Sequence, residues 1–73
     1  MTRYINRNGN SNIEAYEIGY DYIDVKFFGI YKIYRYSYNS AGKDNVEEAK
    51  LLARQGYGLN SFIMRRMRTL YVR

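Results

Sequence analysis

Apolar and polar residues alternate with a period of two along two stretches in the first half of the chain. In residues 16–20, Tyr, Ile and Tyr alternate with Glu and Gly, and in residues 23–27, Ile, Val and Phe alternate with Asp and Lys. This alternation is typical of β-strands that bury one face. Residues 31–38 favour a third strand, because four tyrosines lie there among other β-prone residues.

Turn residues predict a register for these strands. Gly29 suits the first central position of a two-residue type II′ turn over residues 29–30, and a second turn is expected over residues 21–22. The predicted pairs are Val25–Tyr34, Asp24–Arg35 and Ile23–Tyr36 across the first of these turns, and Ile18–Val25, Glu17–Lys26 and Tyr16–Phe27 across the second. The opposite charges in two of these pairs should stabilise the sheet weakly.

In this register one face of the sheet is apolar and collects Tyr16, Ile18, Ile23, Val25, Phe27, Tyr34 and Tyr36. Tyrosines interleaved with cations can also stack on nucleobases and neutralise phosphates. Because Tyr34 and Tyr36 fall on the apolar face, the sequence favours core packing over base stacking for both. The outer face exposes Phe28, Tyr31 and Ile33 beside charges that largely cancel.

A first helix is predicted from Asn45 to Gln55. Asp44 is expected to cap it, with Glu47 three residues later as in a capping box, and Gly56 suits the position after its end. Its buried stripe would be Val46, Ala49, Leu52 and Ala53, while Leu51 falls on the polar side.

A second, shorter helix is predicted over residues 61–67, capped by Asn60. Together the elements predict an α+β fold, a three-stranded antiparallel β-meander with two C-terminal helices packed on one face (β-β-β-α-α). Residues 1–12 are polar and Asn-rich and predict a loosely ordered lead-in, so that residues 13–73 form the single domain. Residues 69–72 have strand propensity and are expected to run extended along the sheet or its helices.

Composition narrows the chemistry of this 73-residue chain. It has no Cys and no His, which removes disulfides, thiolate metal sites and the commonest metal ligand. No apolar run approaches the roughly 20 residues of a membrane span, and we expect a cytoplasmic protein that does not contact membranes. The serines lack a recognisable activating base, and Glu47 and Glu48 lie on a solvated helix face. We therefore expect no metal, no cofactor, no catalytic residue and no enzymatic activity.

The net charge of +5 is unevenly placed along the chain. No acidic residue follows Glu48, whereas Lys50, Arg54, Arg65, Arg66, Arg68 and Arg73 do. This basic C-terminal region would attract phosphate, anionic lipid or an acidic protein. The alternative is that these charges only keep a small domain in solution.

Several short motifs occur in an order and spacing that resemble the KTSC domain, a small domain found at the C-terminus of some lysyl-tRNA synthetases and as a stand-alone protein. The matching segments are Ser11-Asn12-Ile13, residues 18–21, residues 25–27, Tyr34-Arg35-Tyr36, and the set Gly56, Leu59, Asn60 and Ile63. The resemblance covers residues 11–65 and implies the fold more than an activity. The synthetase context suggests RNA binding. Two departures are the Pro-free stretch over residues 38–45 and Met64, which stands where the family has Arg.

The leading hypothesis from the sequence is a non-enzymatic binding module that contacts RNA or another polyanion. The expected contacts are Arg54, Arg65, Arg66 and Arg68, assisted by Lys43 and Lys50. The alternative is a small protein-interaction module, such as an accessory or inhibitor protein of a phage or mobile element, that binds an acidic partner. Its contacts would be Phe28, Tyr31 and Ile33, or Leu51. An orphan structural domain with no stable partner is the third interpretation.

Overall fold

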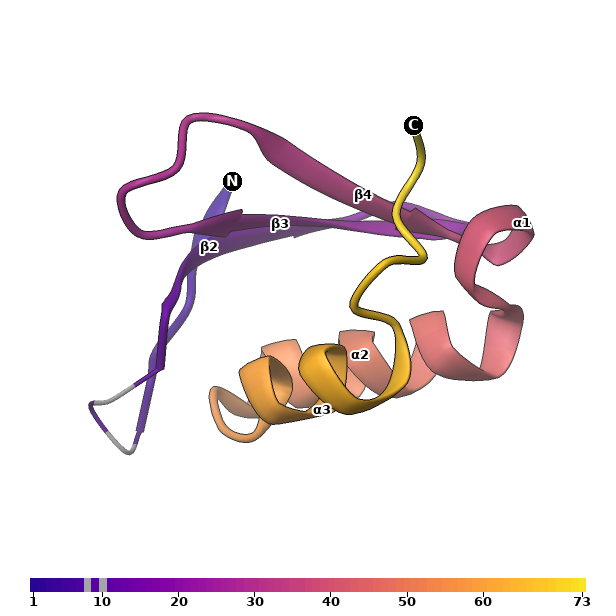
Figure 1. The fold of residues 1–73 in the computed structure, drawn as a ribbon. Coiled ribbons are helices and arrows are strands. Elements are labelled where there is room, and N and C mark those ends of the chain that lie inside the picture. Colours follow the sequence, from indigo (N-terminus) through magenta and orange to yellow (C-terminus); the bar gives the residue numbers. More distant parts are fainter. Residues whose placement is uncertain (8, 10) are drawn as a thin grey trace.

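The computed structural model describes residues 1–7, 9 and 11–73. The strands in these residues are β1 (Thr2–Arg3), β2 (Ile13–Ile18), β3 (Tyr22–Phe27) and β4 (Ile33–Ser37), and the helices are α1 (Tyr38–Ala41), α2 (Lys43–Gln55) and α3 (Leu59–Arg66). The strands form one antiparallel sheet in the order β1-β2-β3-β4. Figure 1 shows α2 and α3 together covering one face of this sheet. The predicted α+β class is confirmed, but the described chain has one strand and one helix more than predicted.

The register between β3 and β4 is the predicted one, with the pairs Ile23–Tyr36, Asp24–Arg35 and Val25–Tyr34. The predicted type II′ turn is wrong, because the connecting loop spans residues 28–32. Its first turn is closed by the Ile30 N–H, which donates to the Phe27 carbonyl at 3.2 Å. Gly29, with φ of +77°, occupies the third position of this turn, whereas a type II′ turn requires the positive φ at the second.

The register between β2 and β3 differs from the prediction, since Ile18 opposes Ile23 rather than Val25. The turn lies over residues 19–21, and Tyr22 is already part of β3. The Tyr22 ring packs over Gly19, where a Cβ atom would collide with it. Because the shift is by two residues, it preserves the face that each side chain occupies, and the predicted apolar face is retained.

The shifted register changes the charge pairs on the outer face. Glu17 opposes Asp24, so the predicted Glu17–Lys26 pair is wrong. The Lys26 ammonium instead contacts the carboxylate of Glu14, at 2.9 Å, next to an irregularity in β2. The predicted Asp24–Arg35 pair is confirmed as a two-pronged bond, with distances of 2.8 and 3.0 Å.

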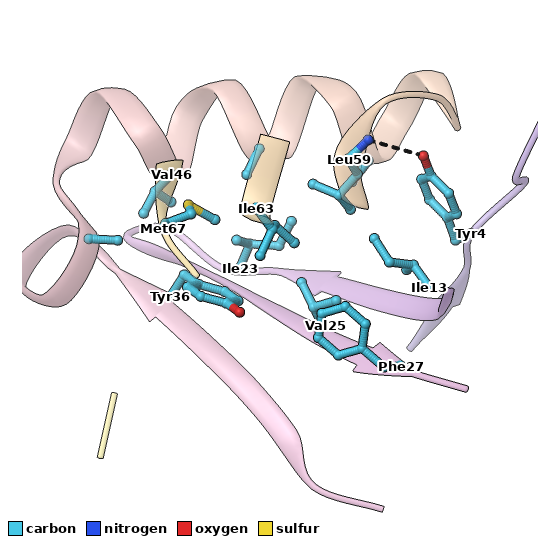
Figure 2. Close-up of a cluster of buried hydrophobic side chains, with 13 residues drawn as sticks. Tyr4, Ile13, Ile23, Val25, Phe27, Tyr36, Val46, Leu59, Ile63 and Met67 are labelled. Atoms are coloured by element: carbon cyan, nitrogen blue, oxygen red, sulfur yellow. Dashed lines mark hydrogen bonds between the residues drawn. The ribbon is translucent and has the colours of Figure 1, made fainter. Parts of the chain in front are cut away.

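The N-terminal segment contributes to both sheet and core, which corrects the prediction of a loosely ordered lead-in over residues 1–12. β1 pairs with β2, and Tyr4 is only 3% exposed. Figure 2 shows the Tyr4 hydroxyl accepting a hydrogen bond from the Leu59 N–H, at 3.3 Å. Burial raises the pKa of Tyr4, and the bond from Leu59 partly offsets this effect. Positions 8 and 10 of the predicted lead-in lie outside the described residues.

The helix ends differ from the predictions at both N-termini. Gly42 is the N-cap of α2, and Asp44 makes no capping hydrogen bond but lies in the first turn, where a carboxylate is favoured by the helix dipole. Gly58 is the N-cap of α3, so the predicted Asn60 cap is also wrong. A capping box does form at α1, between Ser37 and Ser40. No helix in the described residues has the length and apolar character needed to cross a membrane.

The core lies between the sheet and the helical layer (Figure 2). Its buried members are Tyr4, Ile13, Ile23, Val25, Phe27 and Tyr36 from the sheet side and Ala41, Val46, Ala49, Ala53, Leu59, Ile63 and Met67 from the helical side. The predicted helix stripe is confirmed, with Leu52 only partly buried. Tyr36 is a core residue as predicted, while Tyr34 lies at the edge of the core and stays partly exposed.

The C-terminal tail, residues 68–73, returns from α3 to the sheet (Figure 1). The Val72 N–H donates to the Arg35 carbonyl at 2.7 Å, and the Tyr71 ring packs edge-on against Tyr34 with 4.9 Å between ring centroids. The expected approach of the chain end to the sheet is confirmed at these contacts, but residues 69–72 do not form the expected extended run, because the Leu70 N–H closes a turn by donating to the Met67 carbonyl at 3.0 Å. The returning tail forms one side of the site described next.

Candidate functional site

A groove of about 410 Å³ opens between the β3–β4 hairpin, α3 and the C-terminal tail. Its apolar walls are Phe27 and Ile30 from the hairpin, Tyr34 from β4, Met64 from α3 and Tyr71 from the tail. Pockets for small ligands typically measure roughly 300–1,000 Å³ and combine apolar walls with a few polar groups. The groove therefore has the size and the apolar lining of a binding site.

Polar side chains complete the groove. They are Asn12, Tyr36, Asn60, Arg68 and Thr69, and none of the described lining residues is acidic. Arg68 is exposed and forms no ion pair with any described residue. The groove thus joins aromatic walls to a positive charge that no neighbouring carboxylate neutralises.

The Tyr36 hydroxyl is the least expected polar group in the groove. Tyr36 is 1% exposed, and its hydroxyl makes no side-chain hydrogen bond to a described residue. No fully buried side-chain oxygen or nitrogen in the described chain lacks a partner, and Tyr36 lines the groove. We therefore interpret this hydroxyl as one that meets solvent on the groove side. Burial raises the pKa of Tyr36 to about 12. The hydroxyl therefore stays protonated at neutral pH and can both donate and accept a hydrogen bond.

Two further cations lie against the ring of Tyr71, the tyrosine of the C-terminal tail. The Lys32 ammonium lies 4.9 Å from the centroid of the Tyr71 ring and 5.1 Å from that of Tyr34. The Arg73 guanidinium lies 4.9 Å from the Tyr71 ring. Such contacts hold a cation in place by its attraction to the electron-rich ring face and leave its charge uncompensated.

The structure places the basic residues predicted from the sequence on several elements. Arg54 is exposed in the last turn of α2, and Arg65 and Arg66 are exposed in the last turn of α3. None of the ion pairs within the described residues includes these three. Arg68 follows the end of α3. Arg68 is the member of the set that lines the groove.

The two lysines of the predicted set have different surroundings. Lys43 is exposed at the start of α2, and its ammonium lies 6.0 Å from the centroid of the Tyr38 ring. Lys50 is 5% exposed. Its ammonium donates to the Tyr20 carbonyl at 2.8 Å and pairs with the Glu47 carboxylate at 2.8 Å. Lys50 therefore ties α2 to the β2–β3 turn, and its prediction as a phosphate contact is wrong.

The residues predicted for a protein contact are all exposed. Phe28, Tyr31 and Ile33 lie in or beside the β3–β4 loop, and Tyr31 is 98% exposed. Leu51 is exposed on α2, apart from these three in sequence and in fold. The hairpin residues thus form a small apolar tip, whereas Leu51 does not belong to it.

Sequence reasoning missed most of the groove. It assigned Tyr34 and Tyr36 only to the core, and it gave Asn60 a capping role and Met64 and Tyr71 no role in binding. The period-two pattern identified the inward face, but the groove forms where residues far apart in sequence meet at the edge of that face. The Lys50–Glu47 pair, by contrast, had a visible signal, because residues three apart on a helix are neighbours.

Comparisons with protein-family models, with curated proteins and with solved structures find no match to this chain. The KTSC resemblance therefore stays a prediction that depends on the sequence motifs.

Proposed function

We propose that the protein is a non-enzymatic module that binds single-stranded RNA through its α3 and C-terminal tail surface. The observation that supports this proposal best is the position of Arg68 at an acid-free, aromatic groove. Proteins that bind single strands combine cations that follow the phosphates with aromatic side chains that contact the bases. Here both kinds of side chain occur together.

The other arginines extend the same positive surface. Arg65 and Arg66 lie on α3, the helix that also contributes Met64 to the groove. A guanidinium without an acidic neighbour can donate two hydrogen bonds to one phosphate. Arg54 and Lys43 are exposed at the ends of α2 and would assist through longer-range attraction. Lys50 has no part in this proposal.

The salt dependence of binding tests the proposal. With a fluorescently labelled oligouridylate, anisotropy measured over a series of KCl concentrations should give a log–log slope of about −2 to −3, for three or four phosphate contacts at roughly 0.7 each. Replacing Arg65 or Arg68 with Gln should reduce the magnitude of the slope by about 0.7 in each case. Phosphate contacts carry no sequence information, so the reduction should be the same for other RNA sequences.

Arg3→Gln provides a control with the same change in charge. Arg3 is exposed on β1, at the opposite edge of the sheet from β4, and its loss should leave the slope unchanged. An unchanged slope in a folded Arg65→Gln/Arg68→Gln variant would remove this surface as the contact site.

The second candidate function is a protein-interaction module that uses the hairpin tip. It is favoured by the almost complete exposure of Tyr31 beside Phe28 and Ile33, since an exposed aromatic cluster is typical of an interface anchor. Absence of RNA binding even at about 50 mM salt, where electrostatic affinity should be high, would favour this alternative. Membership of the KTSC family is likewise a proposal, which the order and spacing of the motifs support.

A further inference from the structure

The groove has a chemical character that a simple polyanion site does not need. Phosphate recognition requires cations and N–H donors, but Phe27, Tyr34 and Met64 add apolar and aromatic surface to the lining of the groove. A phosphate gains nothing from contact with this surface, whereas a flat, weakly polar group packs well against it. Within single-stranded RNA, that group is the nucleobase.

The polar groups of the groove restrict the chemical class of the ligand further. Tyr36 and Asn60 both line the groove, and neither the Tyr36 hydroxyl nor the Asn60 amide makes a side-chain hydrogen bond to a described residue. Figure 2 shows the Tyr36 hydroxyl at the end of a ring that lies along the sheet, directed toward the side of Val25 and Phe27. Together these groups provide donors and acceptors for the edge of a planar ring.

An aliphatic side chain from a protein partner would fit the walls less well. It would cover the Tyr36 hydroxyl without replacing the water that the groove admits, and a buried hydroxyl without a partner is destabilising. A nucleobase has polar atoms along its edge and can replace that water with a direct hydrogen bond. The unpartnered hydroxyl therefore favours a base over an apolar plug.

We infer that the groove binds a single unpaired nucleobase, with the Tyr36 hydroxyl and the Asn60 amide on its polar edge and the Arg68 guanidinium on the adjoining phosphate. This inference rests on the proposed RNA binding and specifies the ligand of that same surface. The aromatic and thioether side chains of the walls contact the faces of the base. The site binds bases in general, because the Tyr36 hydroxyl and the Asn60 amide can each donate and accept a hydrogen bond.

Binding of two matched oligonucleotides tests the inference. One is an oligoadenylate, and the other has the same length and phosphates but carries abasic sugars at the internal positions. The base-bearing oligomer should bind about 5- to 150-fold more tightly, which is the range for contact of one base with aromatic side chains. Both oligomers should show the salt dependence expected for contacts with phosphate.

Variants locate the effect in the groove. Tyr36→Phe keeps the ring and removes the hydroxyl, and it should weaken binding of the oligoadenylate about 2- to 10-fold, as expected for one hydrogen bond. Asn60→Ala should act in the same direction. Neither substitution should change binding of the abasic oligomer. Tyr38→Phe is the matched control, because Tyr38 lies outside the groove and its hydroxyl donates to Glu47.

The possible results separate the two proposals. Equal affinity for both oligomers, with a normal salt slope and no effect of Tyr36→Phe or Asn60→Ala, would overturn the base site and leave RNA binding intact. Failure of both oligomers to bind at low salt would overturn RNA binding and the base site with it. A third result is that the base-bearing oligomer binds more tightly but Tyr36→Phe and Asn60→Ala both leave this preference unchanged. That result would place the base elsewhere and also overturn the inference.

Discussion

Two clusters of tyrosines and cations lie in different parts of the molecule, and they use the same residue types differently. The closed cluster consists of Tyr20, Tyr38, Glu47 and Lys50. In it the Lys50 ammonium bonds both the Tyr20 carbonyl and the Glu47 carboxylate, and the Tyr38 hydroxyl donates to the same carboxylate at 2.6 Å. This bond raises the pKa of Tyr38 to about 12. Every polar group named here has a partner within the protein.

The open cluster consists of Tyr34, Tyr36, Tyr71 and Arg68. It also has aromatic packing, with Tyr34 and Tyr71 nearly perpendicular to each other, but none of the described residues that line its groove is acidic. The Arg68 guanidinium and the Tyr36 hydroxyl consequently lack partners among the described residues. The clusters differ in the Glu47 carboxylate and in the burial of the cation, since Lys50 is buried and Arg68 is exposed. In the cluster with the carboxylate, the cation stabilises the fold. In the cluster without it, the cation is free to bind a ligand.

The largest expected effect that separates the clusters is on stability. Lys50→Met should lower the free energy of unfolding by about 1–3 kcal/mol, because the Tyr20 carbonyl and the Glu47 carboxylate lose a partly buried charged donor. Arg68→Met should change it by less than about 0.5 kcal/mol, as is usual for an exposed side chain without such partners. Urea denaturation of both variants measures the difference. Equal losses of stability would remove the distinction between closed and open clusters.

A smaller effect should appear in the pH dependence of stability. Hydrogen bonds from Lys50 and then from Tyr38 lower the pKa of Glu47 in the folded protein. A carboxylate with a lowered folded pKa stabilises the protein above its unfolded pKa, and this contribution is lost as the pH falls through the folded value. Glu47→Gln should therefore be less stable than the wild type at pH 7 and should lose less stability on acidification.

Thermal unfolding between neutral and acidic pH measures this effect. Glu48→Gln is the control, since Glu48 is an exposed neighbour on α2 with no ion pair among the described residues. Parallel pH profiles for the wild type and Glu47→Gln would show that the closed cluster contributes nothing to acid sensitivity.

The sequence pattern predicted which face of each strand is buried, and the two strand registers show how far that information reaches. A slip of one residue between β3 and β4 would have turned the charged side chain of either Asp24 or Arg35 toward the core, so the pattern alone excluded it. A slip of two between β2 and β3 leaves every residue on its own face, and the pattern cannot detect it. The packing of Tyr22 over Gly19, which local sequence does not reveal, accompanies the actual register.

The candidate site was predictable only in part, for a related reason. Exposure of Arg65, Arg66 and Arg68 follows from their charge and from the lack of acids nearby in sequence. The burial of Lys50 depends on the Tyr20 carbonyl, 30 residues away, and the groove depends on the return of Tyr71 to Tyr34. Contacts of this kind are set by the packing of whole elements, so a reading of local motifs does not find them.

The most direct test of the difference between the clusters is to map the binding surface by NMR. Backbone and side-chain resonances are compared before and after addition of the oligoadenylate. We expect the largest shifts at Tyr34, Met64 and Tyr71, and unchanged resonances at Tyr38 and Lys50. Shifts confined to the closed cluster or to the hairpin tip, or no shifts at low salt, would contradict the assignment of the open cluster as the binding site.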